Sequence, residues 1–292
     1  MTELAIIQMK MHMDEKSNIS LAKELVIKAA ENKAQIILLP ELFAHPYFCQ
    51  VEDESYFTLA HQIQGHPYLE EFQSLAAAYN VVLPISFFEK AHQSYFNSLI
   101  VFDADGKNLG LYRKLHLPDG PGYEEKFYFS PGNLPIKTWK TRYGTIGTGI
   151  CWDQWFPEFA RSLVLQGADL LLFPTAIGSE PGEVKSPSNH EMWQKVMIGH
   201  AVANSCYIAA ANRSGKEMIG SQTCDFYGHS FIANYKGAIE REAKKDVEII
   251  HTTIDSLEAA HFRAGMGFFR DRRCEWYRTL LTLDGTTASR WD

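Results

Sequence analysis

Short apolar runs alternate with amphipathic stretches along almost the whole chain. The short runs have the length and flanking turn residues of buried strands, whereas apolar residues spaced three and four apart predict helices. The predicted strands are Leu4–Met9, Gln35–Leu39, Val81–Phe88, Asn97–Asp103, Gly110–Leu117, Gly144–Cys151, Asp169–Phe173, Cys206–Asn212, Ser230–Asn234 and Glu248–Ile254. The predicted helices are Glu15–Asn32, Pro67–Tyr79, Pro157–Gln166, Pro187–Asn204 and Ser256–Arg263. Strands that alternate with helices in this way predict an α/β fold.

Turn-forming residues support these boundaries. Pro67, Pro157 and Pro187 fall at predicted helix starts, where the missing N–H costs least. Asn80 and Gly167 fall just past predicted helix ends, where a left-handed residue commonly ends a helix.

The two halves of the chain share one pattern. Residues 34–40 (AQIILLP) and 168–174 (ADLLLFP) are each an apolar strand that follows a helix and ends at proline. The repeat suggests two similar halves, although helix–strand units of any α/β fold look alike. The Pro/Gly-rich stretches 118–122 and 178–187 are too short to be linkers and lie beyond strand ends, where binding loops gather. We therefore expect one domain over residues 1–292.

Composition narrows the class of protein. The chain has 292 residues, of which 46% are hydrophobic and 22% charged, so it can bury a sizeable core. A net charge of −7 argues against nucleic acid as a partner. No apolar run approaches the roughly 18 residues of a membrane span, and the first residues do not resemble a signal peptide. The five cysteines form no Cys-x-x-Cys pair, which argues against a disulfide framework or zinc site and favours the cytoplasm.

Cys151 is the strongest candidate for chemistry. It follows a Gly-rich apolar run, YGTIGTGICWD over residues 143–153, that predicts a strand ending in a sharp turn. The glycines allow close backbone approach and unusual φ angles, as an exposed nucleophile on a turn requires. The alternative is a cysteine that only packs in the core, which is the usual case. That alternative fits the other cysteines, Cys49, Cys206, Cys224 and Cys274.

Three ionisable residues could serve such a thiol. Glu41 directly follows an apolar strand and a proline, so it is either a solvated strand-end residue or a general base for the thiol. Lys114 lies among apolar residues, and strand alternation puts it on the opposite face from Arg113, so one of the two points inward. A lysine beside a reacting carbonyl can stabilise an oxyanion. Glu125 either orients Lys114 or substrate, or is a surface charge of its loop.

Other sites are weaker. His116, His190 and His200 are candidates for a Cys–His site, but no spacing singles out any of them, and His200 fits a core residue. The glycines at 144, 147 and 149 run in the wrong order for a dinucleotide-binding loop.

Taken together, Pro40-Glu41, Arg113-Lys114 and residues 149–153 (GICWD) resemble the signature of the nitrilase, or carbon–nitrogen hydrolase, superfamily. The resemblance covers nearly the whole chain. It implies Glu41, Lys114 and Cys151 as catalytic residues, with Glu125 as a further glutamate and Glu124 as the adjacent alternative. It also implies a four-layer α-β-β-α sandwich of two pseudo-symmetric halves, a homo-oligomer of two or more chains, and no metal or organic cofactor.

Further segments resemble the branch of that superfamily that hydrolyses N-carbamoylputrescine in polyamine biosynthesis from agmatine. They are residues 39–43 (LPELF), 46–50 (PYFCQ), 116–129 (HLPDGPGYEEKFYF), 149–158 (GICWDQWFPE), 174–181 (PTAIGSEP) and 269–273 (FRDRR). The resemblance implies attack by Cys151 on the ureido carbon, with Lys114 and the Trp152 backbone N–H at the oxyanion. It also implies that the C-terminal tail, about 265–292, contributes to oligomer contacts.

The substrate's primary ammonium should meet an acid. Our candidate is Glu180, with Tyr47, Trp152 and Trp155 as aliphatic or cation–π walls. A solvent-facing loop acid is the alternative interpretation of Glu180. Substrates such as N-carbamoyl-β-alanine or an ω-amide carry a carboxylate and would need a cation there instead. A catalytically silent scaffold of the same fold is a further alternative, against which the intact Glu–Lys–Cys set argues.

Overall fold

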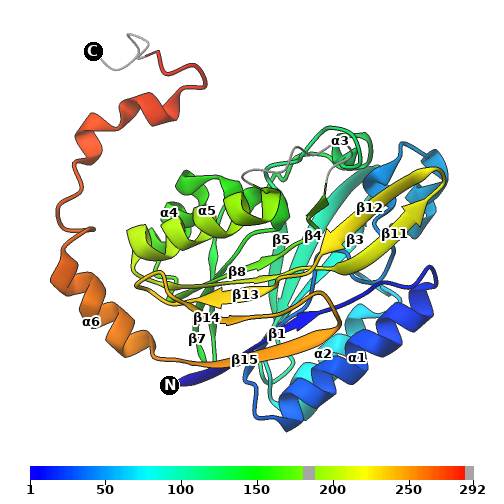
Figure 1. The fold of residues 1–292 in the computed structure, drawn as a ribbon, viewed down its shortest axis with the longest axis horizontal. Coiled ribbons are helices and arrows are strands. Elements are labelled where there is room, and N and C mark those ends of the chain that lie inside the picture. Colours follow the sequence, from blue (N-terminus) through cyan, green and yellow to red (C-terminus); the bar gives the residue numbers. More distant parts are fainter. Residues whose placement is uncertain (180–187, 287–292) are drawn as a thin grey trace.

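The computed structural model describes residues 1–179 and 188–286 and contains two sheets that lie face to face (Figure 1). The first sheet has the strand order β15-β1-β2-β3-β4-β5. Backbone hydrogen bonds join β2 to the residues just before β3, and the bond from the Ile37 N–H to the Val82 carbonyl is 3.0 Å long. The strands are β1 (Thr2–Gln8), β2 (Ile36–Leu38), β3 (Leu83–Ala91), β4 (Ser94–Phe102), β5 (Asn108–Arg113) and β15 (Glu248–Ile254).

The second sheet has the order β14-β13-β10-β8-β7-β6. Its strands are β6 (Thr138–Thr141), β7 (Gly144–Thr148), β8 (Leu170–Pro174), β10 (Tyr207–Ala211), β13 (Phe231–Ala233) and β14 (Ile239–Glu242). A smaller sheet, β11-β12-β9, extends from one end and consists of β9 (Gly178–Ser179), β11 (Ser214–Ile219) and β12 (Gln222–Tyr227).

The two large sheets repeat one topology. In the first half, β1, α1 (Glu15–Glu31), β2, α2 (Leu69–Tyr79) and β3 form a parallel unit that continues antiparallel into β4 and β5. In the second half, β7, α4 (Pro157–Leu165), β8, α5 (Asn189–Asn204) and β10 form the same unit, which continues into β13 and β14. An antiparallel strand flanks each first strand, β15 beside β1 and β6 beside β7. The predicted pseudo-symmetry is therefore confirmed.

Strand alternation produces the four layers. On β1, Leu4 and Ile6 are fully buried in the core that also contains Ile208 of the second sheet. The intervening Ala5 is buried in a second core with Val26 of α1. Because successive side chains point to opposite faces, one strand contacts both the facing sheet and the helices behind it. Helices α1 and α2 cover the outer face of the first sheet, and α4 and α5 cover that of the second (Figure 1).

Most predicted elements are confirmed, with shifted ends. Asn80 ends α2 with φ 56°, and Gly167 follows α4 with φ 95°, as the turn residues predict. Helix α2 begins at Leu69, two residues after Pro67, and α5 begins at Asn189, while Pro187 lies outside the described residues. The apolar pattern does not predict β6, β9, β11, β12, β14 or the short helix α3 (Glu125–Tyr128).

One prediction about the cysteines is wrong. Cys49, Cys206 and Cys224 are buried, but Cys274 is exposed. It lies in a short 3-10 turn, Cys274–Trp276, beyond the core, so packing does not explain it.

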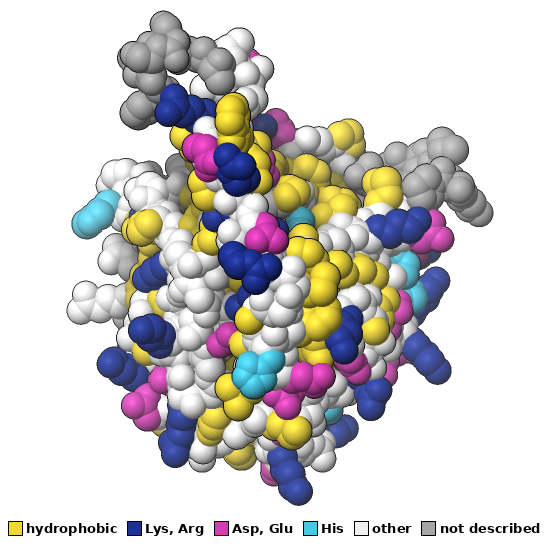
Figure 2. Space-filling view, turned by 90° about the vertical axis from the view of Figure 1, so that its left-hand side faces the viewer, with side chains coloured by type: hydrophobic (Ala, Val, Ile, Leu, Met, Phe, Trp, Pro, Cys, Tyr) yellow, Lys and Arg dark blue, Asp and Glu magenta, His cyan; other side chains and the backbone are white. Residues whose placement is uncertain are grey.

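After α6 (Ser256–Met266), Phe269 still packs against Arg161 of α4, and the rest of the C-terminal segment projects from the body (Figure 1). Figure 2 shows hydrophobic side chains exposed on the face from which this segment projects. The exposed hydrophobic side chains of the segment itself include Trp276, Tyr277, Leu280, Leu281 and Leu283. Within the described residues, no helix has the length and apolar character needed to cross a membrane.

Candidate active site

Cys151 lies on a sharp turn between β7 and the 3-10 helix η3 (Cys151–Trp155). Its φ of 41° is in the left-handed region, which non-glycine residues rarely adopt. The unusual φ thus belongs to Cys151 itself and not to the preceding Gly149. Gly149 instead permits close packing, because a Cβ there would lie 2.5 Å from Phe159 and 2.8 Å from Phe173.

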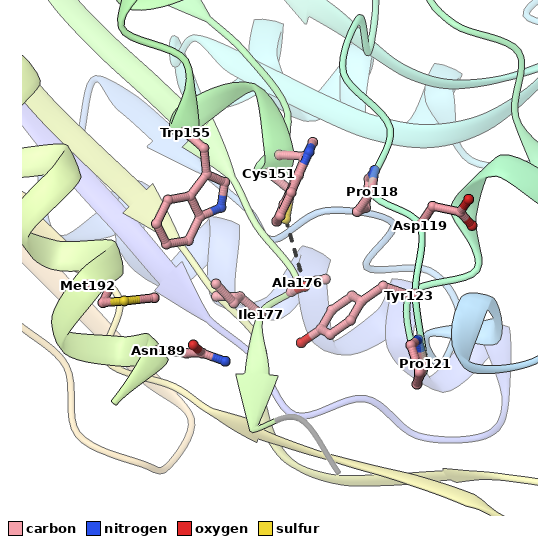
Figure 3. Close-up of a pocket in the computed structure, with 12 residues that line it drawn as sticks. Pro118, Asp119, Pro121, Tyr123, Cys151, Trp155, Ala176, Ile177, Asn189 and Met192 are labelled. Carbon is pink, nitrogen blue, oxygen red and sulfur yellow. Dashed lines mark hydrogen bonds between the residues drawn. The ribbon is translucent and has the colours of Figure 1, made fainter. Parts of the chain in front are cut away.

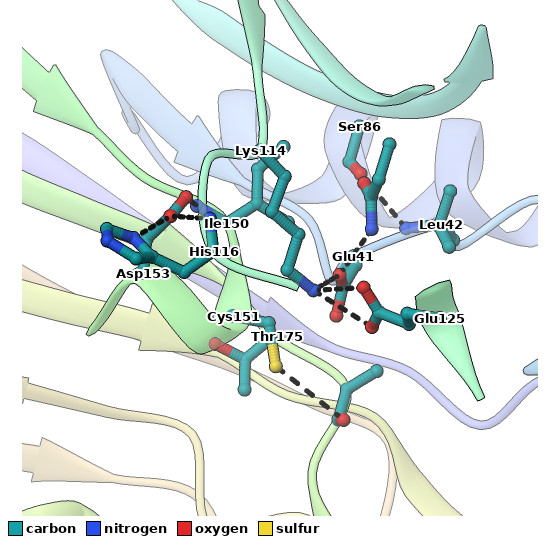
Figure 4. A network of polar contacts seen from close by, with 12 residues as sticks. Glu41, Leu42, Ser86, Lys114, His116, Glu125, Ile150, Cys151, Asp153 and Thr175 are labelled. Atoms are coloured by element: carbon teal, nitrogen blue, oxygen red, sulfur yellow. Dashed lines mark hydrogen bonds and ion pairs between the residues drawn. The ribbon is translucent and has the colours of Figure 1, made fainter. Parts of the chain in front are cut away.

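Asp153 holds this turn. Its fully buried carboxylate accepts hydrogen bonds from the backbone N–H groups of Ile150 (2.9 Å) and His116 (3.0 Å). The Tyr112 hydroxyl donates to it at 2.7 Å, and His116 Nδ1 lies 2.8 Å away. One carboxylate therefore joins the start of the turn to the loop that follows β5 (Figure 4). Four such contacts can hold a residue in a strained conformation.

Glu41 lies in the loop after β2 and is fully buried. Its Oε1 accepts hydrogen bonds from Lys114 Nζ and Asn97 Nδ2, both at 2.7 Å. Its Oε2 is also buried and has no hydrogen-bond partner within the described part of the chain. This oxygen is therefore the one able to exchange a proton with a neighbouring group.

Arg213 holds the backbone of the Glu41 loop. Its Nη2 donates to the carbonyl oxygens of Glu41 (2.8 Å) and Leu42 (2.7 Å). Glu217 neutralises this buried guanidinium at 3.1 Å. The loop needs such support because Leu42 has a φ of 48° and contributes no helix or strand hydrogen bonds.

Lys114 is buried at the point where β5 ends. Its Nζ contacts Glu41 as above and both oxygens of Glu125, at 2.9 Å and 2.6 Å. Arg113 points to the other face and pairs with Glu89, as strand alternation predicts. Glu125, and not Glu124, is therefore the loop glutamate that contacts Lys114 (Figure 4).

Burial and mutual charge shift the pKa values of this cluster. Burial would lower the pKa of Lys114, but Glu125 and Glu41 outweigh it and hold the pKa above its ordinary value. Burial, opposed by Lys114 and assisted by Glu41, raises the pKa of Glu125 to about 7. Burial and then the charge of Glu41 raise the pKa of the Cys151 thiol well above its ordinary value. The resting thiol therefore favours its protonated form, and a protonated thiol needs a base before it can act as a nucleophile.

A cavity of about 490 Å³ opens above Cys151. Trp152 and Trp155 line it, as predicted for pocket walls, and so does Tyr123 (Figure 3). Asp119 is the only charged side chain among the described residues that line it. Glu180, the predicted ligand for the ammonium, lies outside the described residues.

Tyr47 does not line this cavity, contrary to the prediction of a pocket wall. It is fully buried, and its hydroxyl donates to Glu125 Oε1 at 2.7 Å. Its ring packs against Phe226 and Tyr123. Tyr47 is therefore a buried hydrogen-bond donor to Glu125 and not a wall of the cavity. A buried carboxylate needs such donors.

The candidate histidines have other partners. His116 pairs with Asp153, His200 Nε2 lies 2.8 Å from the Gln154 carbonyl, and His190 lies beside Glu242. Within the described part of the chain, Cys151 Sγ donates its hydrogen bond to the Ala176 carbonyl, at 3.8 Å. This arrangement does not support a Cys–His site.

Asn97 and Arg213 support Glu41, although the sequence motifs do not single them out. Asn97 is a buried amide inside the apolar run 94–102 (SYFNSLIVF), and a polar residue in such a run is a usable signal. Arg213 lies between β10 and β11 and gives no comparable signal, because the carbonyl groups that it holds are distant in sequence.

Comparisons with known proteins agree with this geometry. The family model described as carbon–nitrogen hydrolase matches residues 3–264. An N-carbamoylputrescine amidase of Oryza sativa subsp. japonica is 49% identical over 93% of this chain and 91% of that protein. A citrullinase of Francisella tularensis is 45% identical over 96% of this chain and 98% of that protein. The crystal structure of a carbon–nitrogen hydrolase from Helicobacter pylori G27 is 35% identical, with a TM-score of 0.89 over 97% of this chain and 99% of that one. The chain therefore belongs to the carbon–nitrogen hydrolase family.

Proposed function

We propose that this enzyme hydrolyses N-carbamoylputrescine to putrescine, CO2 and ammonia, the last step of a route from agmatine to a polyamine. The observation that carries the proposal is the set of N-carbamoylputrescine amidases that match at 46–49% identity over almost the whole chain. The cavity adds support, because Asp119 gives it negative charge suited to a cationic substrate.

In the proposed reaction Glu41 takes the proton of the Cys151 thiol, and the sulfur attacks the ureido carbon. Ammonia leaves with a proton from Glu41, which yields a thiocarbamoyl enzyme. Glu41 then activates water, and the released carbamate decomposes to the amine and CO2. The unpartnered Oε2 of Glu41 supports these proton transfers, and the raised pKa of Cys151 explains why a base is needed.

Lys114 and the backbone N–H of Trp152 would stabilise the oxyanion. Glu125 and Tyr47 would act as positioning residues, because both Glu125 oxygens contact Lys114 Nζ and Tyr47 contacts Glu125. A lysine held between two carboxylates remains charged, which an oxyanion donor must do.

At the distal end of the cavity we propose that acidic side chains bind the substrate ammonium. Glu180 remains the sequence-based candidate, and Asp119 is a second candidate from the cavity lining. Trp152 and Trp155 would contact the aliphatic chain. Glu180→Gln and Asp119→Asn should each be compared with wild type. Substitution of the residue that binds the ammonium should raise KM about tenfold or more while kcat stays within twofold, and unchanged KM in both variants would contradict this assignment.

A substrate panel tests the function directly. Ammonia release is measured with N-carbamoylputrescine, citrulline, N-carbamoyl-β-alanine and an ω-amide, and putrescine is identified by chromatography. We expect the highest kcat/KM for N-carbamoylputrescine, since a carboxylate would meet Asp119 unfavourably. Cys151→Ala is the control and should lose turnover while keeping its fold. A higher kcat/KM for citrulline, or substantial turnover by Cys151→Ala, would refute the proposal.

We also propose that the enzyme is a cytoplasmic homo-oligomer of two or more chains, with the tail from about residue 265 at the contact. A groove of about 970 Å³ lies between α4, α5 and the tail, and it is lined by residues that include Phe268, Tyr277 and Leu280. The exposed apolar side chains of the tail would be buried against a second chain.

A further inference from the structure

Three metal-ligating side chains outside the Glu41–Lys114–Cys151 cluster come together. His190 lies in the first turn of α5, His229 in the loop between β12 and β13, and Glu242 at the end of β14. Their ligand atoms lie within 4.8 Å of one another. Residues far apart in the sequence thus place two imidazoles and one carboxylate around a common point.

The distances fit a small ion after a modest adjustment. Glu242 Oε1 lies 2.7 Å from His229 Nδ1 and 3.5 Å from His190 Nε2. In a tetrahedral zinc site with bonds of about 2.0–2.1 Å, ligand atoms are about 3.4 Å apart. The His229–Glu242 pair must open slightly, and neither side chain is buried.

His190 provides a second, independent observation. Its Nε2 is a buried atom that makes no hydrogen bond of good geometry within the described residues, and it lies 3.5 Å from Glu242 Oε1. A buried ring nitrogen normally has a partner. The rings of His190 and His229 lie 4.2 Å apart, centroid to centroid, so the two imidazoles are direct neighbours.

We propose that His190, His229 and Glu242 bind one divalent transition-metal ion, of which Zn²⁺ is the type case, at a site separate from the catalytic cluster. Imidazole and carboxylate together suit this class of ion, and water completes the coordination. The ion ties the first turn of α5 to β14 and to the β12–β13 loop. Because Asn189 and Met192 of the same turn line the substrate cavity, the ion stabilises one wall of that cavity (Figure 3).

The test is calorimetric titration of the untagged full chain with ZnCl2. The parent protein carries Cys151→Ala and Cys274→Ser, so that the catalytic and the exposed thiol do not bind the ion. We expect one saturable site per chain, weakened at least tenfold by His190→Ala or His229→Ala. Glu242→Gln should also weaken it, whereas His251→Ala, on β15, serves as the matched control and should bind as the parent does.

A second measurement separates specific binding from misfolding. ZnCl2 should raise the thermal midpoint of the parent and of His251→Ala, because an ion bound only by the folded state stabilises it. The rise should vanish in the His190→Ala/His229→Ala double variant, whose midpoint without zinc should stay near that of the parent. Equal zinc affinity in the double variant, or no saturable binding by the parent, would overturn the proposal.

Discussion

Replacing Asp153 by asparagine should destabilise the turn that carries Cys151. Each carboxylate oxygen accepts one backbone N–H: Oδ2 from Ile150 at 2.9 Å and Oδ1 from His116 at 3.0 Å. Asparagine turns one of these acceptors into an NH2 donor. Whichever way the amide is oriented, one backbone N–H then faces a donor, and no rotation satisfies both.

The magnitude follows from these contacts. A hydrogen bond to a charged group contributes about 1.5–3 kcal/mol, and a buried unsatisfied N–H costs about 1–3 kcal/mol. We therefore expect Asp153→Asn to lower the free energy of unfolding by about 3–5 kcal/mol. Tyr112→Phe is the matched control, because it removes one hydroxyl contact to the same carboxylate and leaves both backbone bonds; it should cost about 1–2 kcal/mol.

Urea unfolding at one fixed chain concentration measures both losses, since oligomer stability depends on concentration. In parallel, kcat/KM for N-carbamoylputrescine should fall at least a hundredfold in Asp153→Asn and less than tenfold in Tyr112→Phe. Limited proteolysis in native buffer checks that each variant is folded before kinetics are compared. If the two variants match in stability and in activity, the carboxylate does not hold the turn and the reasoning fails.

The remaining predictions concern the buried cluster and the tail. Lys114→Ala should lower kcat about a hundredfold or more if the ammonium stabilises the oxyanion, and steady-state kinetics with near-normal kcat would exclude that role. Because burial raises the pKa of Glu125 to about 7, the folded state holds a proton that the unfolded state releases at lower pH, so this group makes stability fall as pH rises towards 7. Unfolding measured against pH should lose this slope in Glu125→Gln. Trp276→Glu with Leu280→Glu should reduce oligomer mass in light scattering, whereas Met218→Glu, an exposed apolar residue outside the tail, should not.

Hydrophobic patterning predicts the buried strands well and the edge elements poorly. Most of the predicted strands have continuous apolar runs because they lie inside the two large sheets and bury both faces, whereas the edge strands β5 and β15, although also predicted, are only partly buried. The hairpin of β11 and β12 has mixed burial, with Lys216 and Glu217 in one strand, so its composition resembles a loop. The pairing of β1 with β15 joins opposite ends of the chain, and no local pattern encodes it.

The site residues show the same contrast between what local sequence reveals and what depends on contacts distant in sequence. Glu41, Lys114 and Cys151 can be found from the sequence because each is a reactive residue at the end of an apolar strand. The role of Tyr47 cannot, because an aromatic residue near Glu41 fits a pocket wall and a buried support equally well. The hydrogen bond to Glu125 that decides between them spans 78 residues. Asp153 stands out in the sequence only as a polar neighbour of Cys151, since its partners Tyr112 and His116 come from another strand end.

The charge of the buried cluster explains why it contains two glutamates. Lys114 alone with Glu41 would form a closed ion pair beside a thiol whose own pKa is raised. Glu125 contacts the same ammonium through both of its oxygens, so that two carboxylates share one positive charge. Full ionisation of both carboxylates leaves one net negative charge beneath the cavity, which favours a cationic substrate and a proton on the cluster. In the proposed mechanism, the second glutamate thus helps to keep the buried lysine charged for the oxyanion, while Glu41 keeps an oxygen for the proton of Cys151.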